Sequence, residues 1–159
     1  MYSPNSKLNN DLDPNIQFIP VLKFEKTHDN AKLPTKDHDS DTGYDVYSVE
    51  DKVIPARSSA VVGVGLKFAY IPEGYWIKVE SRSGLGFKYG IMAHPGIIDC
   101  GYRGDAGVKL YNLTEVDYSV KIGDRIAQFV VYMNFSMPVE WGKAEQSERG
   151  EKGFGSSGK

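Results

Sequence analysis

The last ten residues, GEKGFGSSGK (150–159), carry two spacings found in proteins that hold phosphate. Gly153, Gly155 and Gly158 fit G-x-G-x-x-G, while Gly153, Gly158 and Lys159 fit G-x-x-x-x-G-K. In dinucleotide-binding folds and P-loops, such glycines open a helix whose first N–H groups bind the phosphate. The sequence ends at Lys159, so we expect no such helix, and the hydroxyl residue that follows a P-loop lysine is missing. A loose glycine- and serine-rich tail is the plain alternative.

A second stretch, HPGIIDCGYRGDAGVKLYN (94–112), places an acid next to apolar residues. We interpret it as a hairpin with Ile97 and Ile98 as buried walls and with Asp99 and Tyr102 pointing into a pocket. An aspartate held beside apolar groups can act as a base on water. An ordinary hairpin with an aspartate in its turn remains an equally simple interpretation.

Three further stretches have residue types that suit a polyanion site, although each can also be a plain turn or strand. ESRSGLG (80–86) places a cation and two hydroxyls before a glycine pair, which can present a guanidinium and backbone N–H groups to phosphate. HDSDTGYDVYS (38–48) sets Asp39, Asp41 and Asp45 around a glycine turn. GDRIAQF (123–129) buries Gln128 in an apolar strand, where the amide needs a hydrogen-bond partner.

The elements that must position these stretches are predicted to be short strands. In 75–81, Tyr75, Ile77 and Val79 alternate with Trp76, Lys78 and Glu80, which is the period of a strand with one buried face. We predict strands at 16–24, 60–71, 75–81, 106–113, 117–122 and 124–132. Turn signals recur about every ten residues between them, as in sandwiches, barrels and jelly rolls, and 84–90 is predicted to form one helical turn. The fold class is therefore all-β.

Composition excludes several classes of protein. The chain has 159 residues, which favours a single domain, and 19 basic against 21 acidic side chains, a net charge of −2. Such a balance gives no general attraction to nucleic acid, and no apolar run is long enough to span a membrane. The only cysteine, Cys100, cannot form an internal disulfide, and no Cys/His group has zinc spacing. We expect a cytoplasmic protein (host cytoplasm if viral).

Taken together, the five stretches resemble the trimeric dUTP diphosphatase (dUTPase) family in order, spacing and identity, from about Ile16 to Gly158. The resemblance implies a β jelly roll, a homotrimer with shared active sites, and Mg²⁺ as cofactor. It implies hydrolysis of dUTP to dUMP and pyrophosphate, which removes dUTP and supplies dUMP. It also implies a β domain (15–142) and a mobile C-terminal lid (143–159), whereas the flexible N-terminal arm (1–14) is expected from its Asn-, Asp- and Pro-rich composition and is longer than the resemblance implies.

The resemblance also implies a role for each matching residue. Asp99 would be the base for the attacking water, and Tyr102 would lie against the deoxyribose and exclude a 2′-OH. Uracil would be bound by the hairpin and covered by the tail, through Gly96, Ile97, Ile98, Cys100 and Phe154. The phosphates would be bound by Arg82, Ser83, Gly84, Gln128, Arg149, Gly155, Ser156 and Ser157. Asp45, and with it Asp41, would lie near the metal, behind its direct ligands.

Three alternatives compete with this assignment. A dCTP deaminase of the same fold would need a glutamate in the strand after the hairpin, where GVKLYNLT has Asn112 and no Glu before Glu115. A nucleotide-responsive regulatory protein on the same scaffold remains possible, with residues 1–14 as a contact region. A purely structural jelly roll would leave Asp99, Tyr102 and the tail unexplained.

Overall fold

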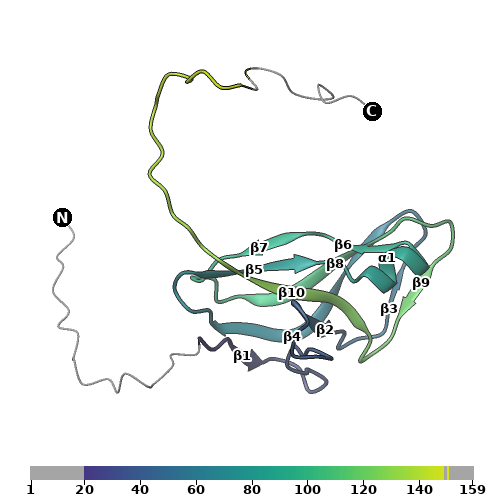
Figure 1. The fold of residues 1–159 in the computed structure, drawn as a ribbon. Coiled ribbons are helices and arrows are strands. Elements are labelled where there is room, and N and C mark those ends of the chain that lie inside the picture. Colours follow the sequence, from purple (N-terminus) through teal and green to yellow (C-terminus); the bar gives the residue numbers. More distant parts are fainter. Residues whose placement is uncertain (1–19, 149, 151–159) are drawn as a thin grey trace, which may run out of the picture.

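The computed structural model describes residues 20–148 and 150 (Figure 1). The predicted arm at 1–14, and residues 149 and 151–159 of the predicted lid, lie outside this part of the chain. The elements are β1 (Lys23–Lys26), β2 (Gly43–Tyr47), β3 (Lys52–Ile54), β4 (Ser59–Tyr70), β5 (Tyr75–Glu80), α1 (Ser83–Tyr89), β6 (Ile91–Ala93), β7 (Gly96–Ile98), β8 (Asp105–Asn112), β9 (Tyr118–Val120) and β10 (Arg125–Met133).

Two four-stranded sheets form the body of the protein. One has the strand order β1-β4-β8-β6 and the other β2-β10-β5-β7, and β3 and β9 form a separate pair. All of these pairings are antiparallel. Phe68 from the first sheet and Phe129 from the second meet in the core, with ring centroids 5.7 Å apart. The predicted all-β, jelly-roll-like class is confirmed.

The period-two pattern correctly assigned the faces of β5. Ile77 and Val79 are buried, whereas Trp76, Lys78 and Glu80 are only half-buried on the other face. Fully burying one such apolar side chain contributes about 1.5–3 kcal/mol. Alternation therefore predicts which side of this strand faces the core.

The predicted hairpin at 94–112 is wrong in its pairing. β7 pairs with β5, and β8 pairs with β4 and β6, so the segment crosses from one sheet to the other. Because Ile97 is opposite Lys78 on the outward side of β5, its side chain is 71% exposed, and only Ile98 is half-buried. Ile97 is therefore not a buried wall.

Other boundaries differ by a few residues. The strand predicted at 117–122 is limited to β9, and β1 begins at Lys23 and continues past the predicted end at residue 24. The helical turn predicted at 84–90 is α1, which buries Leu85 and ends at Gly90 in a left-handed conformation with φ of 64°. Sequence patterns did not assign strands β3 or β6. Among the described residues, no helix has the length and apolar character to cross a membrane.

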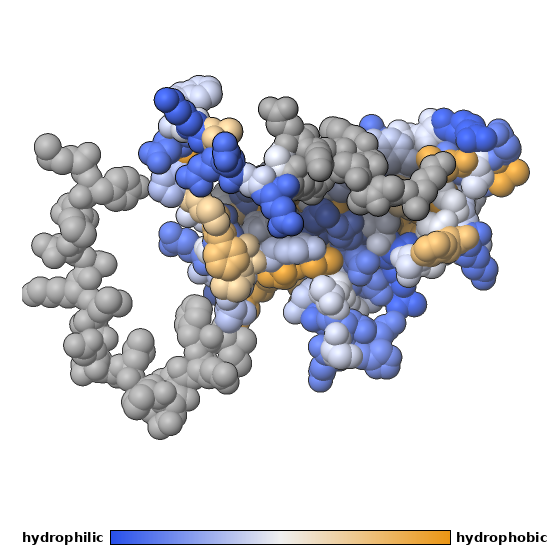
Figure 2. Space-filling model, turned by 45° about the horizontal axis from the view of Figure 1, so that its top comes forward, coloured by the Kyte–Doolittle hydropathy of each residue, from blue (hydrophilic) through white to orange (hydrophobic). Residues whose placement is uncertain are grey.

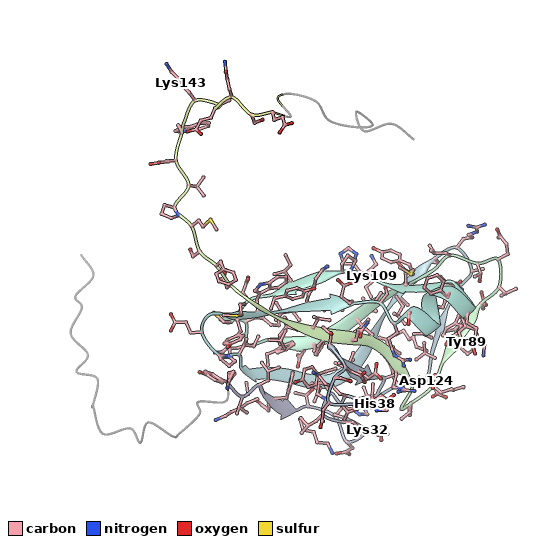
Figure 3. All side chains as sticks on the ribbon, in the orientation of Figure 1. Lys32, His38, Tyr89, Lys109, Asp124 and Lys143 are labelled. Atoms are coloured by element: carbon pink, nitrogen blue, oxygen red, sulfur yellow. The ribbon has the colours of Figure 1, made fainter. Side chains whose placement is uncertain are left out.

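After β10 the chain leaves the core as an extended segment, residues 134–148 (Figure 1). Its side chains point into open space, out to Lys143 (Figure 3). The large apolar residues at alternate positions, Phe135, Met137, Val139 and Trp141, are all strongly exposed. On the face shown in Figure 2, hydrophobic residues form separate patches among hydrophilic ones. Beyond the hydrogen bond from the Asn134 N–H to the Gly74 carbonyl, segment 134–148 thus has a strand-like pattern that pairs with no strand among the described residues.

Candidate active site

Residues of β2 and β10 and of the start of α1 line a first, polar cavity of about 310 Å³. Asp45 on β2 is opposite Gln128 on β10, and Gln128 is opposite Glu80 at the end of β5. Two residues after Glu80, Arg82 directly precedes α1. The cavity is lined by Asp37, Asp41, Thr42, Gly43, Asp45, Arg82, Ser83, Gly84 and Gln128. The predicted phosphate-binding residues of the described chain therefore lie together.

A network of two arginines and two aspartates lies beside this cavity. Arg82 Nε donates to Asp45 Oδ1 over 2.8 Å, and Arg82 Nη1 donates to the carbonyl oxygen of Arg125 over 3.3 Å. Arg125 Nη1 donates to Asp37 Oδ2 over 2.7 Å and to Asp45 Oδ2 over 3.1 Å. The hydrogen bond to Asp37, with the charges of Asp37 and Asp45, raises the pKa of Arg125 above its ordinary value. Both aspartates are thus held by cations.

The Gln128 amide has the hydrogen-bond partner that the sequence analysis expected. Its Nε2 donates to the carbonyl oxygen of Ser81 over 2.9 Å, although the side chain is half-buried instead of fully buried. Gly43 on β2 gives the amide its room, because a Cβ there would lie 2.7 Å from Gln128 Cδ and closer still to Oε1. This glycine therefore determines where the Gln128 amide sits.

A second cavity, also of about 310 Å³, contains the predicted base. Asp99 and Tyr102 both line it, together with Gly96, Ile97, Ile98 and Asp105. The backbone N–H of Tyr102 donates to the Asp99 carbonyl over 3.0 Å and closes a tight turn. Asp99 lies at the surface, and among the described residues no donor contacts its carboxylate.

Two contacts fix the ring of Tyr102 in this cavity. Its hydroxyl donates to the carbonyl oxygen of Asp105 over 3.0 Å, and its ring centroid lies 5.9 Å from that of Phe68. Gly104 makes room for the ring, because a Cβ at that position would lie 2.5 Å from Tyr102 Cζ. Arg103 Nη1 donates to the carbonyl oxygens of Cys100 and Tyr102, both over 2.7 Å, and so braces the turn.

The two cavities share no lining residue among those described. Lys109, which lines the second cavity, lies near the upper edge of the core in Figure 3, and His38, between two residues that line the first, lies near the lower edge. Within one chain, Asp99 and Arg82 therefore line different cavities. The predicted tail residues Arg149, Phe154, Gly155, Ser156 and Ser157 lie outside the described residues.

The described side chains give little support for a metal ion bound by one chain alone. The described residues contain no group of three or more His, Cys, Asp or Glu side chains that could hold an ion. Asp45 uses each oxygen to accept from an arginine, and Asp41 Oδ2 accepts from the His38 backbone N–H over 2.9 Å.

Sequence reasoning missed three residues of the site. Arg125 lies inside the stretch quoted for Gln128, and Asp37 lies one residue before the quoted acidic turn. Asp105 reaches the second cavity from the first position of β8. Arg125 begins β10, the strand that also carries the predicted Gln128, and this shared strand was an available signal, whereas the reach of Asp37 depends on tertiary structure.

Comparison with known proteins decides the family. A sequence model of the dUTPase family matches residues 29–158. This chain belongs to the dUTPase family. A deoxyuridine 5′-triphosphate nucleotidohydrolase of Solanum lycopersicum is 40% identical over 141 residues, which cover 88% of this chain and 83% of that protein.

Solved dUTPase structures agree with this assignment. The Staphylococcus bacteriophage 80alpha dUTPase with dUPNHPP is 30% identical with a TM-score of 0.79, covering 87% of this chain and 98% of that one. A mutant dUTPase from phage phi11 of S. aureus is 25% identical with a TM-score of 0.72, covering 80% and 99%. The two sheets of this dUTPase therefore have the arrangement found in those structures.

Proposed function

We propose that this dUTPase-family enzyme hydrolyses dUTP to dUMP and pyrophosphate, with Asp99 as the base that activates the attacking water. The Asp99 carboxylate lies in a cavity, and no described donor occupies its oxygens. A positioned base typically contributes 10²–10⁴-fold to the rate. Water would attack the α-phosphorus and pyrophosphate would leave, so no covalent nucleophile is required and Cys100 has no chemical role.

The phosphates would lie in the first cavity. Arg82 uses only part of its guanidinium for Asp45 and Arg125, and the remaining N–H groups are available for phosphate oxygens. The first helical hydrogen bond runs from the Gly86 N–H to the Arg82 carbonyl, so the N–H groups of Ser83 and Gly84 have no partner within α1. Together with Gln128, these donors support the proposed phosphate role of the cavity.

Mg²⁺ is the proposed cofactor, with Asp45 and Asp41 behind its direct ligands. The phi11 dUTPase structure is described as revealing a structural Mg(II) ion. Mg²⁺ usually keeps several waters and binds through substrate phosphates and one or two carboxylates. When bound, the ion would neutralise part of the charge on the triphosphate. The arginine-engaged oxygens of Asp45 are compatible with contacts to waters of such an ion.

Uracil and deoxyribose would be bound in the second cavity. The family assignment gives the uracil edge to backbone groups around Gly96, Ile97 and Cys100, with Ile98 beside them and Phe154 over the base. A backbone donor aimed at uracil O4 would face an amino group in cytosine, and a buried mismatch of this kind costs about 1–3 kcal/mol. The fixed ring of Tyr102 supports its proposed role as the wall that excludes a 2′-OH.

The single observation that carries the proposal is the separation of Asp99 and Arg82 into two cavities. It supports a site built from more than one chain. Following the family resemblance, we propose a homotrimer in which one chain supplies the phosphate cavity, a second supplies Asp99, and a third supplies the tail from Arg149 to Ser157. The exposed alternating residues from Phe135 to Trp141 support association as well, because an unpaired apolar strand pattern favours contact with another chain.

The test mixes two inactive proteins. Asp99→Asn alone should keep the fold but lose at least about a hundredfold in kcat, because the base is gone. A second chain, truncated after Glu148, lacks the tail. When equal amounts refold together, a site works if its Asp99 comes from the truncated chain and its tail from the other. Random assembly gives about one half times one half, so about a quarter of the sites should recover.

Two results would contradict the proposal. Asp99→Asn with more than about a tenth of wild-type kcat would remove Asp99 as the base. Mixed trimers, verified by differently tagged chains, that stay inactive would show that base and tail come from the same chain. Pyrophosphate release with dUTP, dCTP, dTTP and UTP, with and without Mg²⁺, tests the substrate and the ion directly.

Deamination has less support than hydrolysis. Asn112, near the place where a deaminase would need its glutamate, is buried and fully used: Nδ2 donates to the carbonyl oxygens of Ile54 and Val116, and Oδ1 accepts from Thr114. A regulatory role is a second candidate, because the 80alpha structure is described in terms of phage dUTPases controlling transfer of virulence genes. The proposed cytoplasmic location is supported by a single, free cysteine, Cys100.

A further inference from the structure

Arg125 contacts the site without lining it. Among the described residues that line the first cavity, Arg125 does not appear, whereas both of its carboxylate partners, Asp37 and Asp45, do. Asp45 in turn accepts from Arg82. An effect of the Arg125 side chain on a bound phosphate must therefore pass through these neighbours.

We propose that Arg125, held by Asp37, is a positioning residue that keeps the Asp45 carboxylate oriented and Arg82 free to bind phosphate. The proposal rests on the phosphate role proposed for Arg82. Arg125 itself would contact neither the substrate nor the reacting atoms.

Orientation is the first part of the effect. The Asp45 side chain is only 16% exposed, and its two oxygens accept from two different guanidinium groups. If the donor on Oδ2 is removed, the carboxylate can turn toward Arg82 and accept from two of its nitrogens at once. A guanidinium and a carboxylate favour this bidentate geometry. Arg82 would then lose N–H groups that otherwise remain for the substrate.

Charge is the second part of the effect. The two arginines and the two aspartates of the network cancel one another, so the cavity wall contributes no net charge from these four groups. Removal of Arg125 leaves an excess negative charge next to the place proposed for a polyanionic substrate. Charges in such partly buried positions are screened less by salt than exposed ones. The substrate would be repelled before any reaction.

The segment before β2 holds Asp37 in reach of Arg125. Thr35 pairs with Asp45 through a β-bridge, with a hydrogen bond of 2.7 Å from the Asp45 N–H to the Thr35 carbonyl. Lys36 lies over the ring of Tyr44 at 4.5 Å from its centroid. The backbone on the N-terminal side of Asp37 is therefore fixed to β2, and its carboxylate meets Arg125 from a defined position.

The geometry predicts which substitution rescues function. Both contacts of Arg125 to carboxylates come from one nitrogen, Nη1. A lysine ammonium concentrates three donors on one nitrogen, although its side chain is shorter. Arg125→Lys should therefore retain much of the function, whereas Arg125→Met, of similar bulk without charge, should not.

The experiment is a double-mutant cycle on the full-length enzyme, with kcat and KM for dUTP and Tm measured for every variant. We expect Arg125→Met to lower kcat/KM about tenfold with a raised KM, and Arg125→Lys to stay within about threefold of wild type. In the background of Arg82→Met, the part of the loss that acts through Arg82 should disappear and only the part due to charge should remain, so the same Arg125→Met change should cost about threefold or less.

A milder pair of variants guards against unfolding. Asp37 is largely exposed, so Asp37→Asn should fold. It removes negative charge beside the proposed phosphate site, so the about two- to fivefold fall in kcat/KM that we expect comes from the lost hold on Arg125 and not from charge. Glu115→Gln is the matched control, because it removes an exposed carboxylate partner of Arg57 outside both cavities, and it should leave kcat/KM unchanged.

Each outcome supports or overturns the inference. An equal loss from Arg125→Met in both Arg82 backgrounds, or an Asp37→Asn variant as active as Glu115→Gln, would show that Arg125 does not act through Arg82. A loss that Arg125→Lys does not relieve, and that follows Tm across the variants, would make Arg125 purely structural. If Arg82→Met itself leaves kcat/KM unchanged, the proposed phosphate role of Arg82 fails instead, and the two failures are thus distinguished.

Discussion

A single methyl group at Gly104 should displace Tyr102 and weaken the selection of deoxyribose. A Cβ at Gly104 would lie 2.5 Å from Tyr102 Cζ and 2.9 Å from Cε2, well inside normal contact. The backbone cannot easily move away, because the carbonyl oxygen of Gly104 accepts from the Phe68 N–H over 3.1 Å. Gly104 also has no positive φ, so alanine is tolerated by the backbone itself. The ring of Tyr102 must therefore move.

The size of the effect follows from the two contacts that hold this ring. The hydrogen bond from Tyr102 to the Asp105 carbonyl contributes about 0.5–1.5 kcal/mol, and the aromatic pair with Phe68 about as much. Losing both would cost about 1–3 kcal/mol, which is about 2–12 °C in Tm for a chain of this length at about 2–4 °C per kcal/mol. Because the ring is half-exposed, we expect the lower end of that range.

The assay is pyrophosphate release with dUTP and with UTP, read as the ratio of the two kcat/KM values. If the displaced ring no longer excludes the 2′-OH, Gly104→Ala should reduce this ratio about tenfold, since 1.4 kcal/mol corresponds to a factor of ten. Gly101→Ala is the matched control: it lies in the same turn, and a Cβ there meets nothing within 4 Å. If the ratios and Tm values of the two variants agree, the steric argument is refuted.

Two other substitutions test the surroundings. Gly43→Ala should raise KM for dUTP about tenfold, because a Cβ at Gly43 would push the Gln128 amide from its place; an unchanged KM would remove Gln128 from the phosphate site. The pKa of Asp51 is lowered, first by the hydrogen bond that its carboxylate accepts from the Ile122 N–H and then by Lys121. The ionised Asp51 therefore stabilises the folded protein above the unfolded pKa of 3.8, and this stabilisation is lost as the pH falls below it. Asp51→Asn should therefore lower Tm near pH 7 but hardly at about pH 2, and an equal loss at both values would contradict the linkage.

Faces of strands and turns were predictable from local patterns. The alternation from Tyr75 to Glu80 needed only the period of a strand, and the end of α1 needed only a glycine that adopts a positive φ. The family resemblance predicted that Asp45, Arg82 and Gln128 belong to the site, and all three line one cavity. Local chemistry is enough wherever neighbours along the chain decide the conformation.

Pairing partners were not predictable in the same way. The stretch 94–112 has the turn residues of a hairpin, but β7 pairs with β5 and β8 with β4 and β6. Hydrogen bonding between strands is the same whatever the partner, so the choice depends on which apolar faces meet in the core. That is a property of the whole sheet, and it is the reason that Ile97 is exposed when the sequence suggested burial.

The charged network shows why the residues of a site can be predicted from sequence although their contacts cannot. Asp37, Asp45, Arg82 and Arg125 come from three separate stretches, and each alone is an ordinary charged residue in or near a turn or strand. Their ion pairs exist only because β2, β5 and β10 are neighbours in one sheet. The same sheet leaves Asp99 in another cavity, so within one chain the predicted base and the predicted phosphate-binding residues lie apart, which the order of the motifs along the sequence does not reveal.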